Sequence, residues 1–391
     1  MSLPHCSWIN ESKQKYMPEK LMPEDTASPH NEMANNQMPA TDDLRIAAMM
    51  TLMPPNELMK EFPVEREVAA IVANARDGIK RILEEEDDRL VVVVGPCSIH
   101  DPEAAMEYAR LLVEQQQKYR DQLLIVMRVY FEKPRTTVGW KGLINDPGLD
   151  GSFEINRGLR TARGLLRDIN SLGLPTGTEF LDLISPQYVA DLVGWGAIGA
   201  RTTESQGHRE LASGLSCPVG FKNGTSGNVQ IAVDAICSAK NPHRFLSVTK
   251  EGRSAIFATK GNADCHIILR GGAHTNYDAA SMDEASALLE KANLSPRIMI
   301  DTSHANSRKK HTRQHYVCRD ICSQVSDGDH RIMGVMVESN LVAGRQDLDS
   351  KELVHGKSVT DACIGWDETV VVLQELNDSV INRRSAGEPL I

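Results

Sequence analysis

The 391-residue chain is predicted to fold as a (β/α)8 barrel, and three observations lead to this fold class. Short, continuous apolar runs recur along the chain, helix-like stretches separate them, and polar or charged residues follow each run. Strands that are apolar throughout are covered on both faces, as in a parallel sheet with helical crossovers. Because the loops after the strands build the active site of such a barrel, the residues that follow the runs are the candidates for chemistry.

The first predicted strand covers residues 91–94, stops at Gly95-Pro96 and presents Cys97. The later runs, each with the candidate group that ends or follows it, are 123–128 with Arg128 and Lys133, 197–199 with Arg201, 219–221 with Lys222, 267–269 with Arg270, 298–300 with Asp301 and His304, and 333–337 with Glu338.

The first predicted helix between strands covers residues 104–117, where Asp101 is an N-cap and Pro102 occupies the first turn. The other predicted helices cover 158–171, 186–193, 228–239, 282–292 and 314–326. A doubly wound open sheet is the alternative fold. It is disfavoured because no Gly-x-Gly-x-x-Gly motif follows the first strand.

The length suits one barrel of about 250 residues with extensions at its ends. We expect residues 1–40 to be a disordered tail and 41–88 an N-terminal extension whose helix begins at Arg66. The catalytic barrel is predicted over 89–376 and a C-terminal tail over 377–391. Residues 244–260 read as an inserted β-hairpin. Such an insert serves assembly or regulation, or is a neutral decoration.

The net charge of −10 argues against general nucleic-acid binding. The basic stretch 308–313 is therefore read as a solvated loop. No run approaches the ~20 apolar residues of a membrane span, and the first residues lack a signal-peptide core. The eight cysteines show no disulfide spacing and are read as reduced thiols. We therefore expect a cytoplasmic protein with no membrane partner.

Four groups are candidate metal ligands. Cys97, His304 and Glu338 follow or end predicted strands, and Asp361 lies just beyond the last one. A thiolate, an imidazole and two carboxylates suit a divalent transition ion. Taken singly, each residue is equally typical of ordinary packing, so their common rim is what indicates a metal site.

A set of cations is expected at the same rim. Because these cations follow apolar strands, we expect their side chains to point into the barrel, where an unpaired charge is costly. Phosphate or carboxylate ligands would neutralise them. Two phosphorylated ligands, or one that also carries a carboxylate, would satisfy them. The cations are Arg128, Lys133, Arg135, Arg201, Lys222 and Arg270.

Several long motifs resemble one family over about residues 42–376. They are 95–98 (Gly-Pro-Cys-Ser), 133–142 (from Lys-Pro-Arg-Thr to Trp-Lys-Gly), 199–205, 220–225 and 358–363. The family is that of the type I 3-deoxy-D-arabino-heptulosonate 7-phosphate (DAHP) synthases. The resemblance implies a barrel transferase that condenses phosphoenolpyruvate with erythrose 4-phosphate, the first step of the shikimate pathway to aromatic amino acids.

The resemblance also implies roles for individual residues. One divalent ion per subunit, Mn, Fe, Co or Zn, would be held by Cys97, His304, Glu338 and Asp361. Phosphoenolpyruvate would be bound by Arg128, Lys133, Arg201, Lys222 and Arg270. Erythrose 4-phosphate would be bound by Pro134, Arg135 and Thr136. We expect Lys133 to donate the proton to the new alkoxide, with its pKa depressed by neighbouring cations, and His304 is the second candidate.

Feedback-inhibited relatives bind an aromatic amino acid near such a hairpin and a neighbouring subunit. The resemblance therefore implies a homo-oligomer, dimer or tetramer, and favours phenylalanine as inhibitor over tyrosine or tryptophan. The matching residues are Asp43, Pro186, Gln187, Leu215, Ser216, Phe245 and Ser247. One departure is Ala273, which follows Gly271-Gly272 where the family commonly has lysine.

Three other functions fit the sequence less well. The related synthase that makes 3-deoxy-D-manno-octulosonate 8-phosphate typically carries Ala-Asn-Arg-Ser in place of Lys133-Pro134-Arg135-Thr136. A Schiff-base aldolase that uses Lys222 would need no metal. A barrel that only senses its ligand would need a damaged metal site, whereas all four ligand positions are filled.

Overall fold

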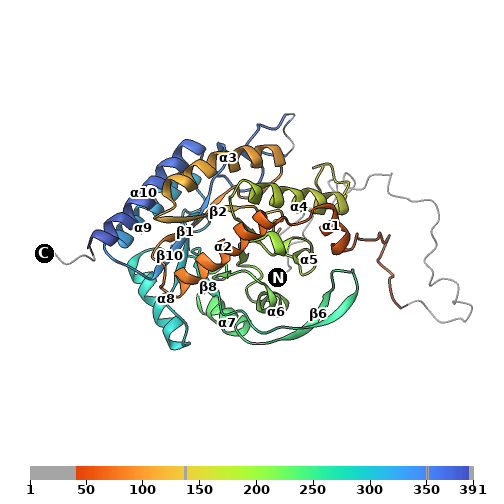
Figure 1. The fold of residues 1–391 in the computed structure, drawn as a ribbon, viewed down its shortest axis with the longest axis horizontal. Helices are drawn as coiled ribbons and strands as arrows, with labels where there is room; N and C mark the ends of the chain where they lie inside the picture. The colour runs from red at the N-terminus through yellow and green to blue at the C-terminus, as the bar shows by residue number, and fades with distance from the viewer. Residues whose placement is uncertain (1–40, 136–138, 349, 351, 387–391) are drawn as a thin grey trace, which may run out of the picture.

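The computed structural model describes residues 41–135, 139–348, 350 and 352–386, and within them the predicted barrel is confirmed (Figure 1). Parallel strands close in the order β1-β10-β9-β8-β5-β4-β3-β2. Their bounds are β1 Leu90–Gly95, β2 Leu123–Arg128, β3 Thr176–Glu179, β4 Trp195–Ile198, β5 Val219–Lys222, β8 Cys265–Leu269, β9 Ile298–Asp301 and β10 Ile332–Glu338.

The strands are apolar on both faces because each face is buried. Val91 and Val93 belong to the cluster inside the barrel, whereas Val92 and Val94 pack outward with the helices. The first strand ends at Gly95, whose φ is 155°. A Cβ at this position would lie 2.7 Å from the carbonyl oxygen of Arg128, so the close approach of β1 and β2 at the rim requires glycine.

Helices cover the outside of the barrel. Asp101 caps α3 as predicted, since its side chain accepts hydrogen bonds from the amides of Glu103 and Ala104. The helices are α1 Pro55–Glu61, α2 Arg66–Leu83, α3 Pro102–Tyr119, α4 Ile155–Ser171, α5 Pro186–Val189, α6 Gln206–Gly214, α7 Gln230–Ala239, α8 Ala279–Lys291, α9 Gln314–Ser326 and α10 Trp366–Ala386, with 3-10 turns η2 Ala190–Leu192 and η3 His311–Arg313.

Several predicted bounds are corrected. The helix expected over 66–88 ends at Leu83, because Glu85 takes a left-handed φ of 63°. Strand β3 was not predicted, since Thr-Gly-Thr-Glu is no apolar run. Residues 377–386 belong to α10, where Val380 is buried, so they are not part of a tail. The predicted tails at 1–40 and 387–391 lie outside the described residues.

The inserted hairpin is present as β6 Arg244–Val248 and β7 Ser254–Ala258. Figure 1 shows it leaving the barrel wall as a curved arm. At its turn, the carbonyl oxygen of Lys250 accepts a hydrogen bond of 2.7 Å from the amide of Asn56 at the start of α1. The arm therefore reaches the N-terminal extension, as regulation or assembly through this region would require.

A second small sheet pairs β11 Val342–Arg345 with β12 Lys357–Ser358 and lies between β10 and α10 in the chain. It leads into the segment that carries Asp361. No helix among the described residues is both long and apolar enough to cross a bilayer.

Candidate active site

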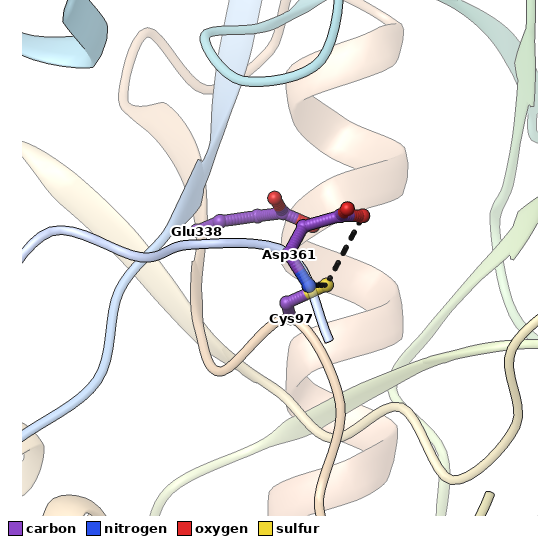
Figure 2. A group of neighbouring side chains, drawn as sticks. All are labelled: Cys97, Glu338 and Asp361. Atoms are coloured by element: carbon purple, nitrogen blue, oxygen red, sulfur yellow. Dashed lines mark hydrogen bonds between the residues drawn. The ribbon is translucent and has the colours of Figure 1, made fainter. Parts of the chain in front are cut away.

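Three of the predicted metal ligands meet at the carboxyl ends of the barrel strands (Figure 2). Cys97 follows β1, Glu338 ends β10, and Asp361 follows β12. One donor atom from each lies within 4.8 Å of the other two. The Cys97 thiol is 3.5 Å from Oδ2 of Asp361 and also contacts the Asp361 amide at 3.4 Å. Residues about 260 positions apart in the chain are thereby brought together at one point by closure of the barrel.

The fourth predicted ligand, His304, adjoins this group. Its Nε2 lies 3.9 Å from Oε1 of Glu338, and its Nδ1 lies 2.8 Å from Oδ2 of Asp301. A carboxylate on the far ring nitrogen is the usual partner of a metal-ligating histidine, because it fixes the ring orientation. The donor set, one thiol, one imidazole and two carboxylates, fits a divalent transition ion.

The protonation of the group follows from burial and charge. Burial, reinforced by the Glu338 carboxylate, raises the pKa of the Cys97 thiol to about 12. For Glu338 the burial penalty is outweighed by His304, Arg128 and Lys133, which lower the pKa of its carboxyl. Without a cation the thiol keeps its proton, so metal uptake by Cys97 would release one.

The Glu338 carboxylate is held from both sides. Its Oε1 accepts a hydrogen bond of 3.0 Å from Arg128, and its Oε2 accepts one of 2.7 Å from the Ser303 hydroxyl. Its backbone amide and carbonyl are both paired with the side-chain amide of Gln314. The orientation of this carboxylate is therefore fixed before any ligand binds.

A cavity of about 570 Å³ opens above these groups. It brings together the cations Lys133, Arg135, Arg201, Lys222 and Arg270, which were expected at one rim because they end or follow strands, and Pro134 lines it as well. Arg128 is instead fully buried beneath them and is not among the lining residues. Thr136 lies outside the described residues.

The expectation that neighbouring cations depress the pKa of Lys133 is wrong. Burial lowers the pKa of Lys133 and Arg128 adds to this, but the interaction with the donor group of Cys97, Glu338 and Asp361 prevails and raises it above its ordinary value. The lysine therefore faces the anionic donor group more than the cationic rim.

The cation Lys222 is partly compensated by an internal partner. Its ammonium lies 2.9 Å from the buried carboxylate of Asp301. Burial raises the pKa of Asp301, but His304 and Lys222 outweigh it and hold that pKa well below its usual range. This ion pair engages the amine that a Schiff-base mechanism would need free.

Asp301 was among the predicted strand-end groups but was given no role; it ends β9 and is fully buried beside Lys222 and His304. Other groups of the site were missed by sequence reasoning. Glu179 ends β3, the strand that was not predicted. Ser303 and Gln314 carry no sequence signal, because their role depends on contact with Glu338 across 24 or more positions. The remaining unassigned lining residues include Thr225, Ser307, Lys309, His311, Arg345, Thr360 and Ala362.

Several residues of the predicted inhibitor pocket lie on the hairpin or contact it. Lys250 at the hairpin turn donates a hydrogen bond to the carbonyl oxygen of Gln187, beside Pro186 at the start of α5. Phe245 and Phe257 pair across β6 and β7, with ring centroids 6.0 Å apart. Ser247 lies on the same strand, and Leu215 and Ser216 follow α6. Within the described chain, Asp43 hydrogen bonds only with Asp42 and Ile46.

The chain matches known proteins along most of its length. The family model described as DAHP synthetase I family matches residues 61–374. The Phe-sensitive phospho-2-dehydro-3-deoxyheptonate aldolase of Escherichia coli K12 is 60% identical over 344 residues, 88% of this chain and 98% of the relative. The Trp-sensitive enzyme of Enterobacter agglomerans is 54% identical over 88% of this chain and 100% of the relative.

The fold comparison agrees. The solved structure of a phospho-2-dehydro-3-deoxyheptonate aldolase from Francisella tularensis SCHU S4 superposes with a TM-score of 0.86 at 55% sequence identity. The match covers 87% of this chain and 99% of that one.

Proposed function

The chain belongs to the DAHP synthetase I family and has the DAHP synthase activity that opens the shikimate pathway; from this premise we propose which of its residues perform the reaction. The single observation that carries the proposal is a cavity shared by a thiol–carboxylate cluster and a set of inward cations. The cluster suits a metal, and the cations suit two phosphorylated substrates.

Cys97, His304, Glu338 and Asp361 are the proposed ligands of one divalent ion, Mn, Fe, Co or Zn. When bound, such an ion supplies a Lewis acid that polarises the aldehyde carbonyl of erythrose 4-phosphate. The protein orients these donors beforehand, because Ser303 and Arg128 fix Glu338 and Asp301 fixes the His304 ring.

Phosphoenolpyruvate is proposed to bind through its phosphate and carboxylate to Lys133, Arg201, Lys222 and Arg270. Burial, and repulsion by Arg201, lower the pKa of Arg270, whereas nearby carboxylates including that of Asp301 raise it. Two cations held close together in a partly buried site favour a shared anion. Arg128 remains in the proposal, but its contacts support a role through Glu338 and the segment of Cys97.

The aldose phosphate is proposed to bind Pro134, Arg135 and Thr136. A hydrogen bond of 2.7 Å from Nε of Arg135 to the carbonyl oxygen of Trp140 orients the Arg135 guanidinium. Among the described residues its other N–H groups have no hydrogen-bond partner, and a guanidinium matches phosphate through parallel hydrogen bonds.

Lys133 is the proposed proton donor to the alkoxide formed when the two substrates join, and His304 is the alternative. The raised pKa of Lys133 keeps the ammonium charged, so the proton is present when the oxygen develops negative charge. A Lys133→Met variant should lose most of its turnover, whereas Lys141→Met, an exposed lysine of the same loop, should retain it. Near-normal turnover of Lys133→Met would remove this assignment.

An aromatic amino acid, phenylalanine in the first place, is proposed to inhibit the enzyme at the pocket of Asp43, Pro186, Gln187, Leu215, Ser216, Phe245 and Ser247. A homo-oligomer, dimer or tetramer, is proposed with it. Support comes from exposed apolar side chains on the extension and hairpin, with Leu44 at 70% and Leu246 at 83% exposure, which suit burial against another subunit. The described cysteines are free, which supports a reducing, cytoplasmic location.

The metal proposal is tested by metal content. A Cys97→Ala protein, desalted after loading with Mn²⁺, should retain much less metal than the parent, as measured by atomic spectroscopy. Cys217→Ala is the matched control, because Cys217 is also a buried, free thiol and lies before β5 at the opposite end of the barrel strands. Equal retention by both variants would defeat the proposed ligand set.

A further inference from the structure

Three basic residues line the active-site cavity without a role in the proposal above: Lys309, His311 and Arg345. Arg345 forms an ion pair with Asp347. Within the described part of the chain, by contrast, no carboxylate lies within 4.0 Å of the Lys309 ammonium or the His311 ring. These two groups therefore face the cavity free to meet an anion.

The backbone conformation of the loop that carries Lys309 is fixed by left-handed residues and by hydrogen bonds. The backbone is left-handed at His304, Arg308 and Lys309, with φ of 50°, 52° and 57°. Side-chain-bearing residues rarely adopt this conformation unless the surroundings impose it. The amide of Lys309 donates a hydrogen bond of 2.7 Å to the carbonyl oxygen of His304. The place of Lys309 is thus tied to that of a proposed metal ligand, whereas Lys310, the next residue, does not line the cavity.

The loop is also anchored on one side of the rim. The amide of Ala305 donates to the carbonyl oxygen of Arg270 at 3.2 Å, and the side-chain amide of Asn306 donates to that of Leu269, both at the end of β8. Strand β8 lies opposite β2 in the barrel order, and β2 precedes the loop of Arg135 proposed for the aldose phosphate. Lys309 therefore lies on the side of Arg270, one of the cations proposed to bind phosphoenolpyruvate.

We propose that Lys309 and His311 form an outer phosphate site at the cavity mouth, which receives the inorganic phosphate released by the reaction. The inference rests on the proposed function for the identity of its neighbours. Inorganic phosphate is the second product, and it leaves from a site lined by the inner cations proposed for phosphoenolpyruvate. On the same side, the Lys309 ammonium and an N–H of the His311 ring give the anion a next contact on its way to solvent, as cations that line a cavity concentrate anions near them.

The test separates this site from the two substrate phosphate sites. Inorganic phosphate is titrated calorimetrically into the full-length, Mn²⁺-loaded protein with saturating phosphoenolpyruvate and no aldose, so that the inner site is filled and no turnover occurs. Phosphate should still bind. Lys309→Met should weaken this binding about tenfold or more, the loss of one charge-assisted hydrogen bond. Lys310→Met should bind within about twofold of the parent, and Lys309→Arg should retain most of the affinity.

Three results of the binding experiment would overturn the inference. The first is that no phosphate binds when phosphoenolpyruvate is saturating. The second is that Lys309→Met and Lys310→Met bind phosphate with equal affinity. The third is that Arg135→Met loses phosphate binding whereas Lys309→Met keeps it, which would place the anion at the aldose site. A rise in the KM for phosphoenolpyruvate in parallel with the loss of phosphate affinity would make Lys309 a substrate contact and also overturn it. Turnover of the parent protein, assayed alongside, reports on the proposed function separately.

Discussion

Arg128 and Glu338 form a buried ion pair at the base of the candidate site. Nη2 of Arg128 lies 3.0 Å from Oε1 of Glu338, and each side chain is only 1% exposed. The same guanidinium donates to the carbonyl oxygens of Pro96 and Cys97. One cation therefore joins the end of β10 to the segment after β1, and the proposed metal ligands from both strands depend on it.

Replacing Arg128 with methionine should destabilise the fold strongly. The change leaves the Glu338 carboxylate buried without its partner, and breaking a buried pair in this way costs roughly 3–5 kcal/mol of unfolding free energy. Urea denaturation measures the loss. Arg110→Met, at an exposed position on α3, should change stability by less than about 0.5 kcal/mol. Similar midpoints for the two variants would contradict the structural role of the pair.

Ser303→Ala should weaken metal binding with little effect on folding. The Ser303 hydroxyl fixes Oε2 of Glu338 at 2.7 Å, and losing such an outer contact typically costs about 10- to 100-fold in metal affinity. Competition with a chelating dye measures the affinity. Ser286→Ala is the control, because that buried hydroxyl on α8 has no hydrogen-bond partner in the described structure. An unchanged dissociation constant for Ser303→Ala would show that Glu338 needs no such support.

Glu132→Gln should flatten the pH dependence of stability. Burial, with the Asp182 carboxylate nearby, raises the pKa of Glu132 to about 8. Between the unfolded value of about 4.3 and the folded value, the folded protein binds the extra proton, so the unfolding free energy falls as pH rises, by up to about 1.4 kcal/mol per unit. The variant should lose less stability between about pH 5 and pH 8 than the parent does. Denaturation curves at both pH values decide this, with exposed Glu154→Gln as control.

Phenylalanine should inhibit the enzyme more strongly than tyrosine or tryptophan, and Phe245→Ala should reduce that inhibition. Phe245 lies beside Phe257 on the hairpin arm, with the two rings tilted at 50°, so its truncation removes an aromatic contact surface from the proposed pocket. Initial rates with each amino acid provide the measurement, and exposed Tyr316→Ala on α9 serves as the control. If none of the three amino acids slows the reaction, the regulatory proposal fails.

The barrel fold could be predicted from the sequence because strands that are buried on both faces consist of continuous apolar residues, as in β1 and β10. Strand β3 escaped this rule, since its Thr, Gly and Glu residues show no apolar run although its first three positions are buried. The extent of α10 beyond residue 376 was missed as well. Most residues of this helix end are polar, so the sequence shows no apolar pattern there. Only a few positions, such as Val380 and Arg383, are buried and hold the helix end in place.

The candidate site was predictable in its residues but not in its pairings. The positions of the predicted strand ends indicated which side chains share the rim of the barrel. The structure brings Cys97, Glu338 and Asp361 together there, as expected. Whether Lys133 faces cations or carboxylates depends on distances that no local pattern encodes, and that expectation was wrong. The roles of Ser303 and Gln314 likewise arise only from contact with Glu338.

The most direct test of the account is the consumption of phosphoenolpyruvate in the presence of erythrose 4-phosphate, before and after EDTA treatment and again after Mn²⁺ is restored. We expect activity to require the aldose, to disappear when the metal is stripped and to return when Mn²⁺ is added. Activity that survives complete stripping, verified by metal analysis, would contradict the proposed metal site formed by Cys97, His304, Glu338 and Asp361.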